Sequence, residues 1–204
     1  MTGCTVPAEG RNRSAARRDL ERWVGSARPL PALAIARKAA ASPGIQAVLL
    51  LRVQIALVER GHRSLARAVS LLNLRLTGAH FGVGCRIGGG LLVPHPQGVI
   101  IGQDVVMGEN CTIYHDVAIG GRSIVEGRED DRQPVIGSGV MIGLRASVLG
   151  PVEVGDGAIV GAHALVLRSV ARGDTVVGVP ASSMKRHTRG VTVPDASTST
   201  AARA

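Results

Sequence analysis

A six-residue repeat runs through the second half of the chain and limits the fold more than any other feature of the sequence. Aliphatic residues or methionine recur at this spacing in two sets: Ile101, Met107, Ile113 and Ile119, then Ile136, Ile142, Val148, Val154, Val160 and Val166. Glycine follows the apolar residue at positions 102, 108, 120, 137, 143, 155 and 161. We expect these glycines to form corners at which the backbone needs unusual dihedral angles.

The repeat predicts a solenoid in which each hexapeptide contributes one short strand. Three hexapeptides close a triangular coil, and stacked coils bury a continuous aliphatic column. The composition fits a narrow column, because 45% of the residues are hydrophobic while the chain has one Phe, one Trp and one Tyr. We therefore predict a parallel β-helix over residues 78–187, followed by a disordered tail over residues 188–204.

The sequence before the repeat predicts an α-helical cap over residues 31–77. Leu49, Val53, Ala56 and Leu57 recur at helical spacing, and Gly61 marks the end of this segment. A second segment over residues 64–76 places on one face Leu65, Ala68, Val69, Leu72 and Leu76. For residues 1–30 we expect a basic, flexible arm, apart from a short helix over Asp19–Val24.

The net charge of +9 lies in the first third of the chain. Residues 1–77 hold 13 Lys or Arg and 4 Asp or Glu, whereas residues 78–204 hold 11 of each. Such a basic region can contact nucleic acid or an acidic membrane. The chain has no nucleic-acid-binding motif, however, and almost no aromatic residues on which bases would stack. We expect no nucleic acid and no membrane partner, with the charge lying on a solvated helical face.

Shorter features bear on the class of protein. The longest apolar run, Ala47–Val58, contains Arg52 and is shorter than the roughly 18–20 residues of a membrane span. The first 20 residues contain no apolar leader segment, so we expect a cytoplasmic protein. The cysteines at positions 4, 85 and 111 lack disulfide or metal-ligand spacing, and the histidines do not supply three suitably spaced ligands. We expect reduced thiols and no metal.

The repeat is interrupted in two places, where inserted residues must loop out of the coil wall. Across residues 93–101 the step is eight residues instead of six, with the extra length in Pro94-His95-Pro96-Gln97-Gly98. The prolines restrict the backbone of His95, and an imidazole held in this way can accept a proton from a hydroxyl near neutral pH. A histidine that satisfies a turn carbonyl is the alternative. Across residues 119–136 the step is 17 residues, and the charged loop there is a candidate lid or subunit contact.

Five motifs, in this order, resemble those of the serine acetyltransferases and, more broadly, of the hexapeptide-repeat acyltransferases. They are HPQGVIIG (95–102), IYHDVAIGG (113–121), DRQPVIGSGVMIG (131–143), VLGPVEVGDGAIVGAHALVL (148–167) and VVGVPAS (176–182). The resemblance covers residues 45–187. It implies a left-handed β-helix and acetyl transfer from acetyl-CoA to a hydroxyl group. It also implies a groove between the subunits of a homotrimer, with a dimer of trimers as the alternative assembly.

The resemblance assigns several residues to the binding of acetyl-CoA. Gly121 matches a glycine whose backbone amide meets the thioester end. Ala146 and Ala164 match small positions along the groove that receives the pantetheine arm. Lys185 and Arg186 are placed to meet the CoA phosphates, with a plain basic tail as the alternative.

His95 matches the catalytic base of the family, but its neighbours in the sequence differ from the family pattern. The Asp that commonly precedes the base is Pro94 here, and the Asp that orients the base is His80. We expect His80 to orient His95, with Asp104 and Asp116 as alternatives.

The residues expected to hold the acceptor are Arg132, which the family retains, and Gln133, which stands where the family has a His. Arg132 can hold a carboxylate by a two-pronged contact, and His115 is a further candidate for the groove. Serine is the expected acceptor, in cysteine biosynthesis. A sugar or secondary-metabolite hydroxyl, an amine, and a solenoid scaffold without catalysis are the alternatives. The chain lacks the C-terminal Ile of the family, so we expect no complex with cysteine synthase.

Overall fold

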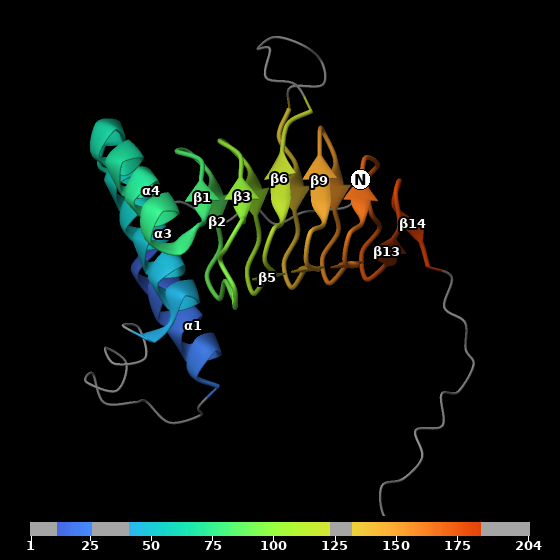
Figure 1. Ribbon diagram of the computed structural model, residues 1–204, viewed down its shortest axis with the longest axis horizontal. Helices are drawn as coiled ribbons and strands as arrows, with labels where there is room; N and C mark the ends of the chain where they lie inside the picture. Colours follow the sequence, from blue (N-terminus) through green and yellow to red (C-terminus); the bar gives the residue numbers. More distant parts are fainter. Residues whose placement is uncertain (1–11, 26–40, 123–131, 185–204) are drawn as a thin grey trace, which may run out of the picture.

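The computed structural model describes residues 12–25, 41–122 and 132–184. Three helices in these ranges stand at one end of a column of short strands (Figure 1), namely α1 (Asn12–Val24), α3 (Pro43–Glu59) and α4 (Arg63–Thr77). Ser42 caps the start of α3, and Gly78 ends α4 in a left-handed conformation with a φ of +78°. No helix of the described ranges is long and apolar enough to cross a membrane.

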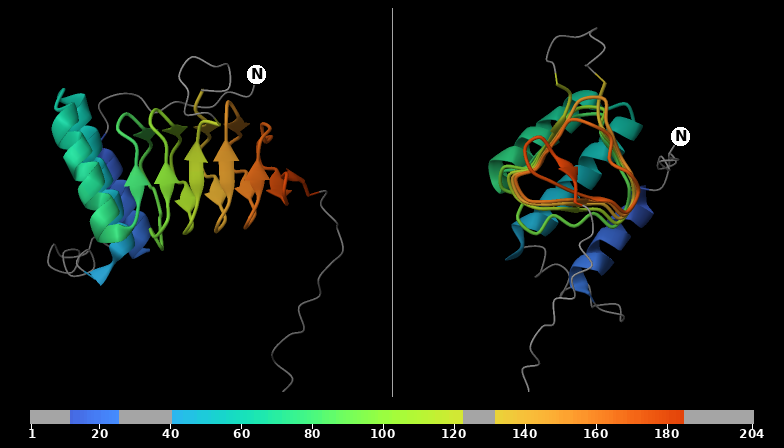
Figure 2. Two further views of the ribbon diagram at one scale, coloured as in Figure 1. Left: turned by 45° about the horizontal axis from the view of Figure 1, so that its top comes forward. Right: turned by 90° about the vertical axis from the view of Figure 1, so that its right-hand side faces the viewer.

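The strands form three sheets, which are the walls of the column. Sheet A contains β1 (His80–Phe81), β3 (Ile100–Ile101), β6 (Ala118–Gly120), β9 (Ser147–Leu149) and β12 (Leu165–Val166). Sheet B contains β2 (Arg86–Ile87), β4 (Val106–Met107), β7 (Val135–Ile136) and β10 (Glu153–Val154). Sheet C contains β5 (Thr112–Ile113), β8 (Met141–Ile142), β11 (Ile159–Val160), β13 (Thr175–Val177) and β14 (Ser182–Ser183). Seen along the column, the chain passes through the sheets in turn and traces a triangle (Figure 2).

The aliphatic column predicted from the repeat fills this triangle. All ten repeat positions, from Ile101 to Val166, are buried, with at most 2% of any of these residues exposed. Strands of successive coils pair in parallel, so that Ile119 lies between Ile101 of the coil before and Val148 of the coil after. The prediction of a parallel β-helix is therefore confirmed, because the six-residue period turns one side chain of each strand inward.

The glycines that follow the repeat positions have a different role from the predicted one. None of the seven has a positive φ, and a residue with a left-handed backbone instead lies two positions after six of them, such as Arg145 after Gly143. A Cβ atom on Gly143 would lie 2.6 Å from the backbone nitrogen of Ala162, and one on Gly137 would lie 2.7 Å from that of Asp156. The prediction of unusual dihedral angles was wrong at all seven positions. At Gly108, Gly137, Gly143 and Gly155 it is the close approach of the backbone of the next coil that excludes a side chain.

The helices that cover the first coil present polar side chains to it. No strand precedes β1 or β2 in the described sheets, so carbonyl groups on their open side need donors from elsewhere. Ser70 Oγ of α4 donates to the carbonyl of Phe81 at 2.6 Å. Arg52 of α3 donates to the carbonyls of Ile87 and Gly88 at 2.6 and 2.7 Å. The cap therefore satisfies the open edge of the coil as well as covering its column.

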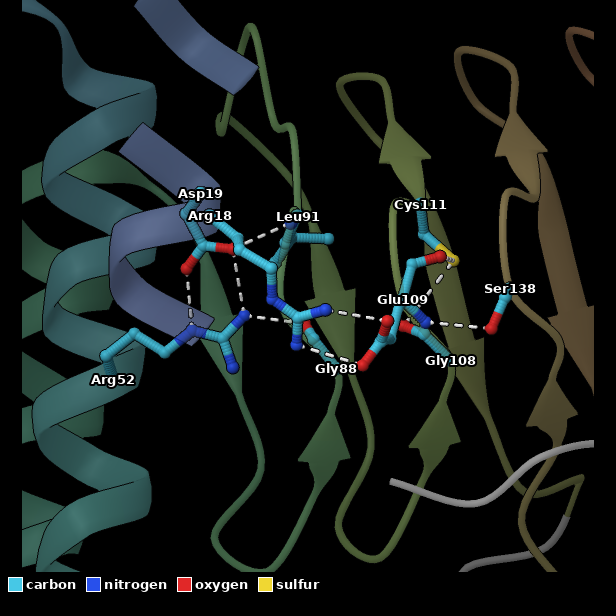
Figure 3. Close-up of polar contacts among 9 residues, drawn as sticks. All are labelled: Arg18, Asp19, Arg52, Gly88, Leu91, Gly108, Glu109, Cys111 and Ser138. Atoms are coloured by element: carbon cyan, nitrogen blue, oxygen red, sulfur yellow. Dashed lines mark hydrogen bonds and ion pairs between the residues drawn. The ribbon is translucent and has the colours of Figure 1, made fainter. Parts of the chain in front are cut away.

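Helix α1 is fixed to the cap and the coil by charged side chains (Figure 3). Asp19 accepts hydrogen bonds from Nε and Nη2 of Arg52, at 2.7 and 3.1 Å, and from the backbone N–H of Leu91 at 2.7 Å. Arg18 makes a two-pronged contact with Glu109, at 2.7 and 2.9 Å. These contacts join one helix to two different coils.

The expectation of a flexible arm over residues 1–30 is therefore wrong for Asn12–Val24, which form a longer helix than predicted. Two of its arginines, Arg18 and Arg22, donate to the coil, and Arg22 Nη1 contacts the carbonyls of Gly90 and Cys111, both at 2.7 Å. Part of the basic charge of the first third thus serves the fold and does not face solvent.

Candidate active site

The turns between the sheets form three edges along the column, and most of the predicted site residues lie along two of them. At the edge between sheets C and A, the turns are residues 93–99, 114–117, 143–146 and 161–164. We call this the C–A edge. The edge between sheets A and B, which we call the A–B edge, includes residues 102–105 and the long interruption of the repeat.

His95 lies at the C–A edge, in the bulged turn between the first two coils. His95 is exposed, whereas Pro96 next to it is buried. The carbonyl of Pro96 accepts a hydrogen bond from the N–H of Val99 at 3.2 Å, and the N–H of Gly98 donates to the carbonyl of Gly78 at 3.1 Å. The bulge is thereby closed back onto the first coil, and the imidazole is left at the surface.

Gly98 is required at the end of this turn. Its φ is +69°, and a Cβ atom there would collide with Oδ1 of Asp116 in the next coil. The backbone N–H of Asp116 also donates to the carbonyl of Gln97 at 2.9 Å. The turn that carries His95 is therefore held between the coil before it and the coil after it.

A second imidazole lies beside His95. The ring of His115, in the next coil, meets that of His95 edge to face, with 6.1 Å between the ring centroids and 79° between the planes. Asp116 accepts a hydrogen bond from Nε of Arg145, one coil further, at 3.3 Å. Sequence reasoning singled out His115 as a groove candidate but missed Arg145. The sequence signal that could have identified Arg145 is its position in the hexapeptide: it lies three residues after the repeat residue Ile142, as Asp116 does after Ile113.

The three candidates for orienting His95 lie in different places. His80 is at the start of β1, in register with Ile100 on the outer wall of sheet A. Within the described residues, no hydrogen bond or ion pair joins His80 to His95. Asp104 lies at the A–B edge, and Asp116 shares the C–A edge with His95. Orientation of the base by His80 stays a prediction, and Asp116 is the carboxylate on the same edge.

Gly121, Arg132 and Gln133 gather at the A–B edge. Gly121 is half-buried and Arg132 is exposed, on either side of a segment, 123–131, that lies outside the described residues. A Cβ atom on Gly102 would lie 2.9 Å from Oε1 of Gln133, so this side chain packs against the neighbouring coil. One chain does not bring these residues to His95, because the width of sheet A separates the two edges.

The remaining residues assigned to acetyl-CoA lie elsewhere. Ala146 and Ala164 are in turns of the C–A edge but are 0% and 1% exposed. Their methyl groups belong to the column, because the residue before each sheet A strand points inward. This position differs from the expected groove lining, and their contact with pantetheine stays a prediction. Lys185 and Arg186 lie outside the described residues.

The described cysteines are structural. Burial raises the pKa of the Cys85 thiol to about 12, and the Cys111 thiol donates to the carbonyl of Gly137 at 3.2 Å. Because the thiolate is the nucleophilic form, the Cys85 thiol is not suited to covalent catalysis, and Cys111 is 1% exposed. Across the described ranges, no group of three or more His, Cys, Asp or Glu side chains could hold a metal ion. The chemistry that the described residues offer at this site is proton transfer by an imidazole.

Comparisons with known proteins agree with the repeat. Residues 133–168 match a family model described as bacterial transferase hexapeptide (six repeats), and residues 98–127 match the hexapeptide repeat of succinyl-transferase. The serine acetyltransferase of Helicobacter pylori (strain J99) is 40% identical over 144 residues, which cover 71% of this chain and 82% of that protein.

Solved structures of serine acetyltransferases are also similar to this chain. The soybean enzyme complexed with serine gives a TM-score of 0.75 at 35% identity, covering 86% of this chain and 70% of that one. The enzyme from Brucella abortus in complex with coenzyme A gives a TM-score of 0.75 at 27% identity, and the match covers 86% of this chain and 68% of that one. With the hexapeptide models, these similarities imply that the β-helix is left-handed.

Proposed function

Because this chain belongs to the serine acetyltransferase family, we propose that it transfers the acetyl group of acetyl-CoA to the hydroxyl of L-serine, in the cysteine biosynthetic route. The observation that carries the proposal is the exposed imidazole of His95 on a backbone held from both sides, within the motif HPQGVIIG. Relatives solved with serine and with coenzyme A support the two substrates.

In this reaction His95 is the general base. It accepts the proton of the serine hydroxyl while that oxygen attacks the thioester carbon, and it returns the proton to the CoA sulfur as the carbon–sulfur bond breaks. Backbone amides near Gly121 stabilise the negative charge that develops on the carbonyl oxygen. Arg132 pairs with the serine carboxylate, and the Gln133 amide hydrogen-bonds the acceptor.

Substitution of His95 tests this role. His95→Ala should lower kcat by roughly 10²- to 10⁴-fold, the usual contribution of a positioned acid–base group. The affinity for CoA, measured by calorimetry, should stay unchanged. His62→Ala is the matched control, because His62 is exposed at the start of α4 and makes no side-chain capping bond. A His95→Ala enzyme that keeps more than a tenth of wild-type kcat would contradict the proposal.

The complete site lies between copies of the chain. Its base is on the C–A edge and its acceptor residues are on the A–B edge, and these edges are separated by sheet A within one copy. In a homotrimer, the C–A edge of one copy faces the A–B edge of its neighbour, so that two copies complete each groove.

Mixed trimers test this arrangement. His95→Ala and Arg132→Glu should each be inactive alone, whereas co-expression in equal amounts should restore about a quarter of wild-type activity, the fraction of interfaces at which both intact groups meet by chance. Activity absent from the mixture would place both groups in one copy. Size-exclusion chromatography with light scattering checks that the mixture assembles as the wild type does.

Two further statements belong to the same proposal and rest on the family resemblance. Lys185 and Arg186 meet the CoA phosphates, and the enzyme acts in the cytoplasm. A dimer of trimers stays the alternative assembly.

A further inference from the structure

Two charged side chains, Asp116 and Arg145, lie close to His95 on the C–A edge. Nε of Arg145 donates to Oδ2 of Asp116 at 3.3 Å, and 60% and 43% of the two side chains are exposed. The other oxygen of Asp116, Oδ1, lies against Gly98 in the turn that carries His95. The ring of His115, the residue before Asp116, contacts that of His95. The carboxylate is therefore next to the turn of the base and open to solvent.

The backbone at Arg145 is unfavourable for an arginine. Five described residues other than glycine have a left-handed backbone, at positions 104, 110, 116, 145 and 163, and Arg145, with a φ of +56°, is the only one of these that is not Asp, Asn or His. Those three residue types are enriched in this conformation, whereas other side chains are uncommon there. The ion pair with Asp116 does not offset this cost, because an exposed pair contributes little to stability. Backbone outliers of this kind cluster at functional sites, and this one holds a carboxylate beside the base.

The acceptor of the proposed function carries two opposite charges. L-Serine is a zwitterion at neutral pH, with an ammonium group and a carboxylate on the same carbon. The proposed function gives the carboxylate to Arg132, but none of the residues that it assigns carries a negative charge. An ammonium group that leaves water without a counter-charge loses much of its solvation free energy. A carboxylate of the protein is therefore needed near His95.

Among the described residues, the turns of the C–A and A–B edges contain two carboxylates, those of Asp104 and Asp116. Asp104 is on the A–B edge, where its Oδ2 accepts a hydrogen bond from Nε2 of Gln103 at 3.4 Å. Asp116 shares its edge with His95 and touches the turn of the base. Within the described ranges, Oδ1 of Asp116 accepts no hydrogen bond. Asp116 is therefore the better placed of the two to bind a cation close to His95.

We propose that Asp116 binds the ammonium group of an amino-acid acceptor, and that Arg145 is the positioning residue that holds the Asp116 carboxylate. The inference rests on the proposed function and names the residue that makes it specific for an amino acid. The ammonium group donates to Oδ1 of Asp116, the carboxylate pairs with Arg132 of the neighbouring copy, and the hydroxyl is directed toward His95. A hydroxyl acceptor without an ammonium group, such as a sugar, gains nothing from Asp116.

Kinetics with two acceptors test the proposal, using the full-length protein and acetyl-CoA. 3-Hydroxypropionate is L-serine without the ammonium group, and it keeps the hydroxyl and the carboxylate. In Asp116→Asn, kcat/KM for L-serine should fall by roughly 10- to 150-fold, the loss of one hydrogen bond between charged groups, mainly through a higher KM. For 3-hydroxypropionate, kcat/KM should change by less than about threefold, because this acceptor has no group that binds Asp116. Arg145→Gln should have a smaller effect in the same direction, since the carboxylate is then free to move.

Asp116→Asn should fold as the wild type does, because asparagine tolerates a left-handed backbone, as Asn110 does with a φ of +59°. Urea unfolding checks this. Glu153→Gln is the matched control, because it removes one exposed carboxylate from the wall of sheet B, and it should match the wild type with both acceptors.

Equal losses of kcat/KM for the two acceptors in Asp116→Asn would overturn the proposal, because they would place the carboxylate at the base and not at the ammonium group. A loss of the preference for L-serine in Asp104→Asn, but not in Asp116→Asn, would also overturn it and assign the ammonium group to Asp104. A wild-type protein that releases no CoA with L-serine would contradict the proposed function itself, and the inference would fall with it.

Discussion

Replacement of Arg52 by Met tests how much of the stability of the cap comes from its buried charges. The guanidinium makes two hydrogen bonds to Asp19 and one each to the carbonyls of Ile87 and Gly88, all between 2.6 and 3.1 Å. The side chains of Arg52 and Asp19 are 5% and 2% exposed. In Arg52→Met, the Asp19 carboxylate stays buried with the Leu91 N–H, and two coil carbonyls lose their donors.

Removing one partner of such a pair costs about 3–5 kcal/mol, because the remaining charge is buried and uncompensated. For Arg52→Met we therefore expect a loss of about 4 kcal/mol in the free energy of unfolding, and a Tm lower by roughly 12 °C for a chain of this size. Asp19→Leu should cost a similar amount. The double variant should be more stable than the sum of the single effects predicts, by at least about 2 kcal/mol, because both charges are then absent.

Urea unfolding followed by circular dichroism, at one protein concentration, measures these differences. Arg17→Ala is the control, since the ion pair of Arg17 with Glu21 is on the surface, with 81% and 55% of the side chains exposed. It should leave the unfolding midpoint unchanged. A loss below about 1 kcal/mol for Arg52→Met, or additive single effects, would refute the view that α1 is held by this network.

Two further predictions concern the coil. Gly98→Ala should lower the free energy of unfolding by more than Gly157→Ala, because both have a left-handed φ, +69° and +67°, but only the Cβ at position 98 would collide with a neighbour. Equal urea midpoints for the two variants would contradict this. The raised pKa of the Cys85 thiol, about 12, should make stability fall above pH 9, its ordinary value, by about 1.4 kcal/mol per pH unit as the thiol of the unfolded chain ionises. Cys85→Ala should lack this part of the pH dependence, and a parallel decline in both proteins would argue against it.

The column could be predicted from the sequence because its packing is one-dimensional. Each hexapeptide turns one branched side chain inward, so the period alone identifies residues such as Met107 and Val160 as core, both at 0% exposure. The role of the following glycines could not be read in the same way. It depends on the distance between stacked coils, and a sequence period carries no information on that distance.

The faces of the cap helices were not predictable from hydrophobicity. In α3 the expected apolar face includes Val53, which is 50% exposed, whereas Arg52 and Gln54 are buried at 5% and 1%. Gln54 Nε2 donates to the carbonyls of Phe81 and Gly82 at 3.1 and 3.2 Å. The first coil needs donors on its open side, and this need decides which helix face turns inward.

The site was predictable in its parts but not in its arrangement. The bulge that carries His95 is visible as an irregular step in the repeat, and so is the interruption before Arg132. Their assignment to different edges depends on whether each insertion comes before or after a strand of sheet A. His95 and Arg132, which were predicted to belong to one site, thus lie apart in a single chain. His115 lies in the corresponding turn of the next coil, and its ring contacts that of His95.

The most direct test of the proposed function is the release of CoA from acetyl-CoA by the purified full-length protein, with and without L-serine, and with mass-spectrometric identification of the product. Saturable, serine-dependent release that yields O-acetylserine is the predicted result. Tight binding of CoA without serine-dependent release, in a protein that is folded and assembled, would contradict serine as the acceptor.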